Sequence, residues 1–162
     1  MRDWRSDKGF SLVEVMVVVA IIGLMTSAVV LAMPSRDDRL LDTLSRTGRL
    51  MVAVERQAVI TGQVMGVHFS DTGMDLLVLG DNGWVPSDAT ISSSDASFGD
   101  ARLLDITVEG ATVDVSDAGL QAHVYFLPTG EKPAFTLTLA SGAKKGTMTV
   151  PQMGPFEVKA DG

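Results

Sequence analysis

One carboxylate stands where carboxylates are rare. Glu14 is the only ionisable residue in a run of 24 residues from Phe10 to Met33. A charged side chain in hydrocarbon costs several kcal/mol and usually marks a function. Alternatively, Glu14 lies only about 6 Å along a helix from Phe10, close enough to a headgroup region to stay hydrated. Glu14 is therefore the first candidate for a functional group, and a hydrated interfacial position is the alternative.

The other residues that could do chemistry do not form a catalytic or metal-binding set. His68 and His123 are the only histidines, and their neighbours repeat neither metal-ligand spacing nor a nucleophile motif. Asp71, Asp75 and the Asp81-Asn82-Gly83 turn offer oxygen ligands without the acid series of a calcium loop. The sequence has no cysteine and no glycine-rich phosphate loop. We therefore expect no catalytic residue, no metal and no cofactor.

Charge is unevenly distributed along the 162 residues, whose net charge is −7. Five of the 13 basic residues and 13 of the 20 acidic residues follow residue 56, so that part carries −8. Such a surface repels phosphate backbones. We therefore expect no nucleic acid among the partners.

The elements that must position Glu14 begin with the apolar run itself. A helix from Phe10 to Met33 is about 36 Å long, enough to cross a hydrocarbon core of about 30 Å. A cleaved secretory signal, the alternative, has a shorter apolar region that ends at a small-residue site. Residues 1–9 hold three basic residues, which favours a cytoplasmic N-terminus, although Arg36 and Arg39 beyond the run weaken this asymmetry. We expect a single-pass membrane helix with the head in the periplasm or outside.

The N-terminal residues resemble the type IV prepilin signature. Lys8-Gly9-Phe10-Ser11-Leu12-Val13-Glu14-Val15 places a basic residue and a glycine before phenylalanine, and a glutamate shortly after it. The resemblance implies that a prepilin peptidase cleaves between Gly9 and Phe10 and that the new Phe10 amino group is methylated. The Glu14 carboxylate can then pair with the Phe10 ammonium of an adjacent subunit, which relieves two desolvation penalties. This pairing would make Glu14 an assembly residue.

A second helix is expected over residues 34–62. Ser35 followed by two acids is a helix-start signal, and Thr61-Gly62 marks the end. Apolar residues recur at helical spacing and predict one buried face, formed by Leu40, Leu44, Met51, Val54 and Ala58. The arginines fall mostly off that face: Arg36, Arg39, Arg46, Arg49 and Arg56. We interpret them as a solvated surface, with pairing between subunits as the alternative.

After Gln63 the pattern changes to strand-like runs between turns, which predicts an antiparallel sheet domain. The expected strands are Val64–Phe69, Met74–Leu79, Leu103–Val108, Val113–Val115, Ala122–Leu127, Phe135–Leu139, Thr147–Val150 and Phe156–Val158. The hairpin turns are predicted at Asp71-Thr72-Gly73, Asp81-Asn82-Gly83, Pro128-Thr129-Gly130 and Ser141-Gly142. The polar stretch near 86–100 is expected to be a mobile loop, with a partner-binding loop as the alternative.

Two pieces of the head resemble the H-type minor pseudopilins of type II secretion. They are the helix end with its following strand, Glu55 to Val67, and the later Phe126-Leu127-Pro128-Thr129-Gly130 with Phe135. The resemblance implies that the Phe-x-Pro-x-Gly turn opens a late hairpin. Proline can preset the turn, glycine can adopt positive φ, and Phe126 and Phe135 can anchor the hairpin in the core.

Together these observations predict an α+β, pilin-like fold in which a long N-terminal helix leads into an antiparallel β head. The predicted domains are a leader at 1–9, a transmembrane and assembly helix at 10–33, a stalk helix at 34–62 and the head at 63–162. By resemblance the chain is a structural subunit of a secretion pseudopilus, not an enzyme, and it is a single-pass inner-membrane protein with its head in the periplasm. The implied partners are prepilin peptidase, other pseudopilins, and an inner-membrane assembly platform with its ATPase. The alternative is a minor pilin of a type IV pilus, which initiates a fibre or takes up DNA.

Overall fold

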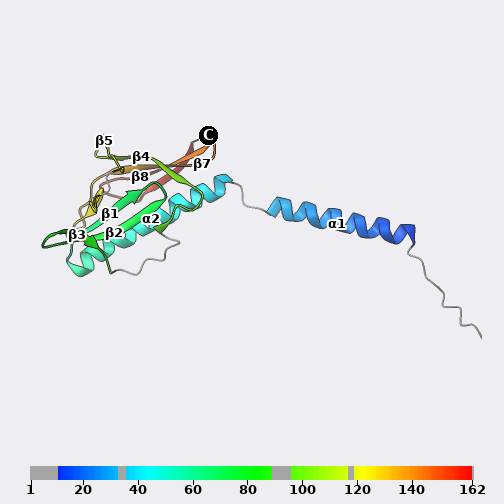
Figure 1. Ribbon diagram of the computed structural model, residues 1–162, viewed down its shortest axis with the longest axis horizontal. Helices are drawn as coiled ribbons and strands as arrows, with labels where there is room; N and C mark the ends of the chain where they lie inside the picture. The colour runs from blue at the N-terminus through cyan, green and yellow to red at the C-terminus, as the bar shows by residue number, and fades with distance from the viewer. Residues whose placement is uncertain (1–10, 33–35, 89–95, 117–118, 162) are drawn as a thin grey trace, which may run out of the picture. The chain divides into compact units, whose positions relative to one another are not determined.

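The computed structural model describes residues 11–32, 36–88, 96–116 and 119–161 (Figure 1). The chain divides into two compact units, Met1–Ser35 and Arg36–Gly162. The described residues of the second unit form the helix α2 (Arg36–Thr61) and two antiparallel sheets, so the α+β prediction is confirmed.

The first unit contains one helix, α1, from Leu12 to Ala32. Just before it, the Ser11 carbonyl oxygen accepts hydrogen bonds from the N–H groups of Glu14 (2.9 Å) and Val15 (3.2 Å). Every side chain from residue 11 to residue 26 is exposed, so α1 has no buried face within its own unit. Among the described residues, no helix is both long and apolar enough to cross a membrane.

The second helix, α2, spans Arg36–Thr61 and belongs to the same compact unit as the sheets. The predicted apolar face is confirmed, because all five of its residues are buried: Leu40, Leu44, Met51, Val54 and Ala58. The helix ends as expected at Gly62, which has a φ of 69° and donates its N–H to the Ala58 carbonyl at 3.0 Å. Glycine adopts this left-handed conformation at little steric cost, which explains why the helix ends there.

The strands form two antiparallel sheets. The first has four strands in the order β3-β2-β1-β6, with β1 at Met65–Ser70, β2 at Gly73–Gly80, β3 at Gly83–Pro86 and β6 at Val124–Phe126. The second has five strands in the order β5-β4-β7-β8-β9, with β4 at Arg102–Val108, β5 at Ala111–Thr112, β7 at Phe135–Ser141, β8 at Lys144–Val150 and β9 at Glu157–Asp161.

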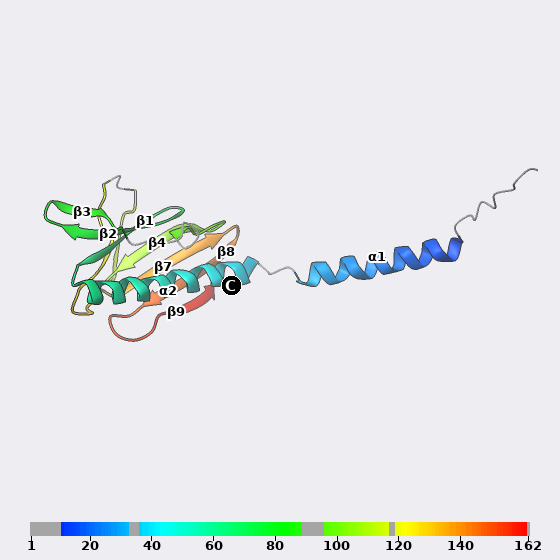
Figure 2. The same cartoon turned by 90° about the horizontal axis from the view of Figure 1, so that it is seen from below.

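The core lies between α2 and the sheets. Helix α2 contacts β7, β8 and β9 of the five-stranded sheet and β1 and β6 of the four-stranded sheet (Figure 2). Gly146 on β8 allows the helix to approach closely, since a Cβ atom there would lie 2.8 Å from Leu44 Cδ1. The largest buried side chains include Phe69, Phe98 and Phe126.

Two sequence predictions about the head are wrong, one strand was not predicted, and the mobile loop near 86–100 stays a prediction. Val113–Val115 is not a strand, because the short β5 precedes it at Ala111–Thr112, and β3 at Gly83–Pro86 was not predicted. The turn at Pro128-Thr129-Gly130 does not close a hairpin, because β6 and β7 belong to different sheets. Part of the stretch near 86–100 is packed, since Phe98 is buried and Ser97 pairs with Gly73 in a β-bridge. Residues 89–95 of that stretch lie outside the described residues.

Candidate functional site

Glu14 lies in the first turn of α1, on a helix whose described side chains are exposed. The large apolar side chains from Leu12 to Met25 are between 47% and 76% exposed. A helix that is apolar on all sides is stable only when lipid or other protein covers it. Gly9 and Phe10, the predicted cleavage and methylation residues, lie outside the described residues, so the pairing of Glu14 with Phe10 stays a prediction.

The Phe-x-Pro-x-Gly motif forms the connection between the two sheets. Phe126 on β6 and Phe135 on β7 are both buried in the common core. Between them the chain turns at residues 127–131, where Gly130 has a φ of 84° and donates its N–H to the Leu127 carbonyl at 2.9 Å. The motif therefore fixes the point at which the chain leaves one sheet and enters the other.

An ion pair attaches this connection to α2. Lys132 Nζ lies 3.1 Å from Glu55 Oε1 and 3.0 Å from Oε2, so it donates to both carboxylate oxygens. The Lys132 side chain is 7% exposed and the Glu55 side chain 27% exposed. Sequence reasoning missed this pair, because the two residues are 77 positions apart and no repeated spacing connects them.

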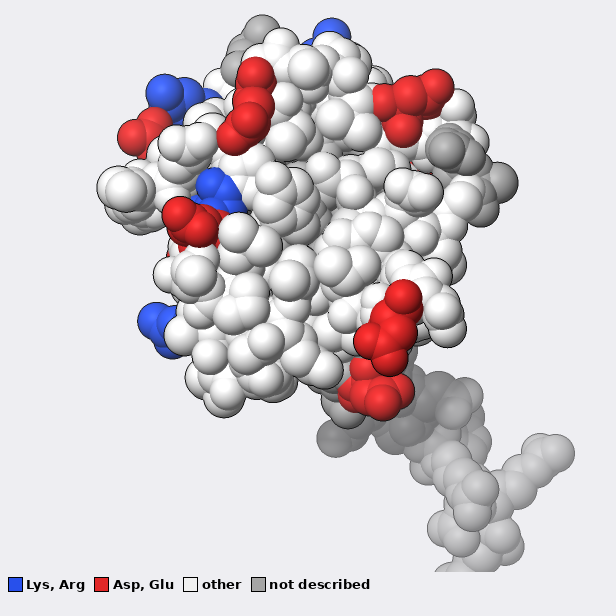
Figure 3. All heavy atoms as spheres, turned by 90° about the vertical axis from the view of Figure 1, so that its left-hand side faces the viewer, with Lys and Arg blue, Asp and Glu red and all other residues white. Residues whose placement is uncertain are grey.

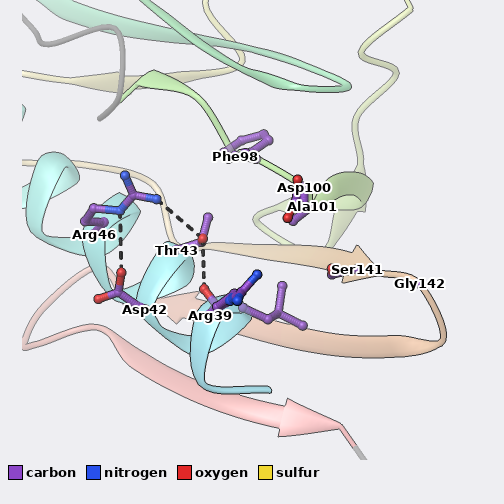
Figure 4. A pocket seen from close by; sticks show the side chains of 11 residues that line it. Arg39, Asp42, Thr43, Arg46, Phe98, Asp100, Ala101, Ser141 and Gly142 are labelled. Atoms are coloured by element: carbon purple, nitrogen blue, oxygen red, sulfur yellow. Dashed lines mark hydrogen bonds and ion pairs between the residues drawn. The ribbon is translucent and has the colours of Figure 1, made fainter. Parts of the chain in front are cut away.

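A cleft of about 560 Å³ opens beside the first turns of α2 (Figure 4). It is lined by α2 residues, by the 98–101 segment and by the turn between β7 and β8: Arg39, Leu40, Asp42, Thr43, Arg46, Phe98, Gly99, Asp100, Ala101, Ser141 and Gly142. Thr43 Oγ1 donates to the Arg39 carbonyl at 2.9 Å and accepts from Arg46 Nη2 at 3.4 Å. Arg46 Nε also lies 3.9 Å from Asp42 Oδ2. Since these polar groups bond to one another and no histidine lines the cleft, the lining residues form no nucleophile and base pair.

The two histidines join β1 of the four-stranded sheet, where His68 lies, to His123 in the segment before β6. Their rings stack with centroids 4.5 Å apart, and His123 Nδ1 accepts a hydrogen bond of 3.0 Å from the Phe69 N–H. Nearby, hydrogen bonds from the Ser116 side chain and backbone lower the pKa of Asp114. Within the described ranges no three histidine, cysteine or acidic residues gather as metal ligands would. The arrangement of His68 and His123 is thus accounted for by packing and backbone bonding.

Two family models match the chain. One, described as a prokaryotic N-terminal methylation motif, matches residues 4–30, and the other, described as type II transport protein GspH, matches residues 47–154. Type II secretion system protein H of Escherichia coli (strain K12) is 32% identical over 146 residues, which cover 85% of this chain and 83% of the relative. The protein H of Klebsiella pneumoniae is 29% identical over 149 residues, which cover 82% and 86% respectively.

Solved structures share the fold. The crystal structure of the minor pseudopilin EpsH from the type II secretion system of Vibrio cholerae matches with a TM-score of 0.64 at 19% identity, and covers 79% of this chain and 98% of that one. The solution structure of Escherichia coli GspH matches with a TM-score of 0.60 at 20% identity, and covers 76% and 89%. At these identities the match shows that the fold is common to all three chains.

Proposed function

The chain belongs to the GspH family, the minor pseudopilins H of type II secretion, and we propose that it enters the pseudopilus as a membrane-anchored subunit whose N-terminal helix has been processed. It is a structural subunit of the pseudopilus, the fibre that helps to export folded periplasmic proteins through the outer membrane. The match over residues 47–154 favours this function over that of a minor pilin in a type IV pilus.

The first part of the proposal is the processing of the leader. Prepilin peptidase removes residues 1–9, and the Phe10 amino group is methylated. The match of the methylation motif to residues 4–30 and the Lys8-Gly9-Phe10 sequence support this step. Glycine before the scissile bond leaves the backbone open to the peptidase, since it has no side chain.

The second part is the anchor and assembly role of the N-terminal helix. The exposed apolar side chains of α1, with Glu14 in the first turn, are the single observation that carries it. The helix rests in the inner membrane before assembly and in the fibre afterwards, and both environments cover its apolar surface. In the fibre the Glu14 carboxylate accepts hydrogen bonds from the Phe10 ammonium of a neighbouring subunit. Neither charge then stays unpaired.

The third part concerns partners and chemistry. Other pseudopilins surround the subunit, and an inner-membrane platform with its ATPase supplies the energy for assembly. The chain itself is proposed to do no catalysis and to need no cofactor. The absence of a glycine-rich phosphate loop from the sequence supports an external energy source.

Complementation tests the proposal in cells that lack this gene and have stopped secreting their type II substrates. The full chain should restore secretion, co-purify with sheared pseudopili, and show a mature mass that starts at methylated Phe10. A variant with a bulky residue in place of Gly9 should accumulate as the uncut precursor. Restored secretion by a chain that keeps residues 1–9 would overturn the processing step.

A further inference from the structure

The second half of α2 has a row of exposed residues on the face that does not pack against the sheets. Arg49, Ala53, Arg56 and Ile60 follow one another at intervals of four, three and four residues and are all exposed. That spacing places them on one side of a helix. The buried residues Met51, Val54 and Ala58 alternate with them, so the row faces away from the sheets.

A groove runs along this row. It has a volume of about 510 Å³ and is lined by Arg49, Val52, Ala53, Arg56, Gln57, Ile60 and Phe156, a set that we call the arginine groove. The ring of Phe156 forms one wall of the groove. It packs so closely on Gly48 that a Cβ atom at Gly48 would overlap the ring. Ile60 is 79% exposed and the adjacent Val59 is 51% exposed. The groove therefore combines apolar side chains, with Phe156 as one wall, and the side chains of Arg49, Arg56 and Gln57.

The charges at this groove are cationic. Arg49 and Arg56 are exposed, and neither side chain forms an ion pair or hydrogen bond with another residue that the structure describes. The nearest acid on the helix, Glu55, is already held by Lys132. The chain after residue 56 carries −8, and the surface at the end of the head where α2 finishes is largely uncharged, with scattered acidic and basic side chains (Figure 3). The groove therefore presents two arginine side chains, without a partner among the described residues, beside apolar side chains.

We infer that the arginine groove is the docking site for the acidic head of a different pseudopilin, which inserts an apolar side chain between two carboxylates. The inference rests on the proposed function, because it needs a neighbour in the fibre. Arg49 and Arg56 are seven residues apart, which is about 10 Å along the helix. Carboxylates seven residues apart on one face of a helix match that separation. Aromatic, arginine and aliphatic groups in a desolvated pocket are typical of interface hot spots.

Cysteine accessibility tests whether assembly covers the groove. The natural chain has no cysteine, so Ile60→Cys and the control Leu104→Cys each place one thiol on the surface. Leu104 suits as a control because it is 51% exposed on β4. We expect maleimide to label the Ile60→Cys variant about tenfold or more slowly in sheared pseudopili than in the unassembled protein, because a docked neighbour excludes the reagent. Labelling of the Leu104→Cys variant should change little. Equal labelling of the Ile60→Cys variant in both states, or equal protection of the two variants, overturns the inference.

Charge reversal tests the chemistry of the partner. Arg56→Glu should lower the amount of the protein in pseudopili about tenfold, since like charges then face each other. Arg102→Glu, the same change at an exposed arginine on β4, should not, and Arg56→Lys should keep most of the incorporation. Equal incorporation of Arg56→Glu and Arg102→Glu overturns the acidic partner.

Two further measurements distinguish failure of the docking inference from failure of the proposed function. They are disulfide crosslinking of the Ile60→Cys variant and detection of the wild-type chain in sheared pseudopili. A dominant disulfide between two copies of the Ile60→Cys variant overturns the choice of a different pseudopilin as the partner. Absence of the wild-type chain from pseudopili refutes the proposed function instead. If the wild-type chain is present in pseudopili but the thiol at position 60 stays reactive there, only the inference about the arginine groove is refuted.

Discussion

Removing one member of the Lys132–Glu55 ion pair should cost more free energy than removing both. Breaking a buried pair costs about 3 to 5 kcal/mol because the remaining charge stays buried without a partner. Glu55→Leu leaves the Lys132 ammonium, whose side chain is 7% exposed, and we expect a loss of about 3 kcal/mol. Lys132→Met leaves the Glu55 carboxylate, which at 27% exposure can recover part of its hydration, so we expect about 2 kcal/mol.

The double variant Glu55→Leu/Lys132→Met should be no less stable than either single variant, because apolar side chains of similar volume often replace a buried pair without loss. This outcome corresponds to a coupling of about 3 kcal/mol in a double-mutant cycle. The measurement is urea unfolding of residues 36–162, which form one compact unit, followed by the fluorescence of Trp84. Trp84 is the only tryptophan in that fragment.

A matched control is the exposed ion pair of Lys159 and Glu157. Lys159 Nζ lies 3.4 Å from Glu157 Oε2, and the two side chains are 75% and 68% exposed. Lys159→Met should change the free energy of unfolding by less than about 0.5 kcal/mol. If Lys132→Met changes stability no more than Lys159→Met, or if the two single effects simply add in the double variant, the reasoning about burial is wrong.

Three further predictions concern other parts of the chain. Glu14→Ala should keep cleavage and membrane insertion but lower crosslinking to neighbouring pseudopilins about a hundredfold, because the Phe10 ammonium loses its counter-charge. Unchanged crosslinking would mean that Glu14 is a hydrated interfacial residue. Gly146→Ala should lower the free energy of unfolding of the head by about 1 to 3 kcal/mol, since the new methyl group meets Leu44 Cδ1 at 2.8 Å, and calorimetry showing no change would refute this. The fragment of residues 34–162, with ten basic and 17 acidic residues, should bind duplex DNA poorly in a titration at physiological salt, and salt-sensitive binding would contradict the charge argument.

The parts of the fold set by local periodicity could be predicted from the sequence. The buried face of α2 follows directly from the spacing of Leu40, Leu44, Met51, Val54 and Ala58, and its end follows from Gly62. The hairpins at Asp71-Thr72-Gly73 and Ser141-Gly142 also form as expected, joining β1 to β2 and β7 to β8. In each case the signal lies within a few neighbouring residues, where helix and turn geometry act directly.

The features that depend on distant residues could not be predicted in this way. A turn at Pro128-Thr129-Gly130 looks the same whether its strands pair with each other or with other strands, and here they join different sheets. Phe98 follows a polar stretch, yet its ring is buried because the chain returns to the core beside β2. Glu55 and Lys132 meet only because that connection packs on α2. The arginine groove could not be predicted either, because the sequence does not show which apolar side chains lie beside an exposed arginine.

The contact of α2 with both sheets has a mechanical consequence. Only residues 33–35 separate α1 from α2, so tension in the N-terminal part of the chain reaches the head at Arg36. A pull along α2 would have to slide the helix past β7, β8, β9, β1 and β6 together, because its contacts extend over both sheets. Near the far end, about 28 Å from Arg36, Lys132 holds Glu55 and opposes that sliding. Forced unfolding depends on the rate at which the whole set of contacts yields, so a subunit built in this way can resist a push or pull on its fibre.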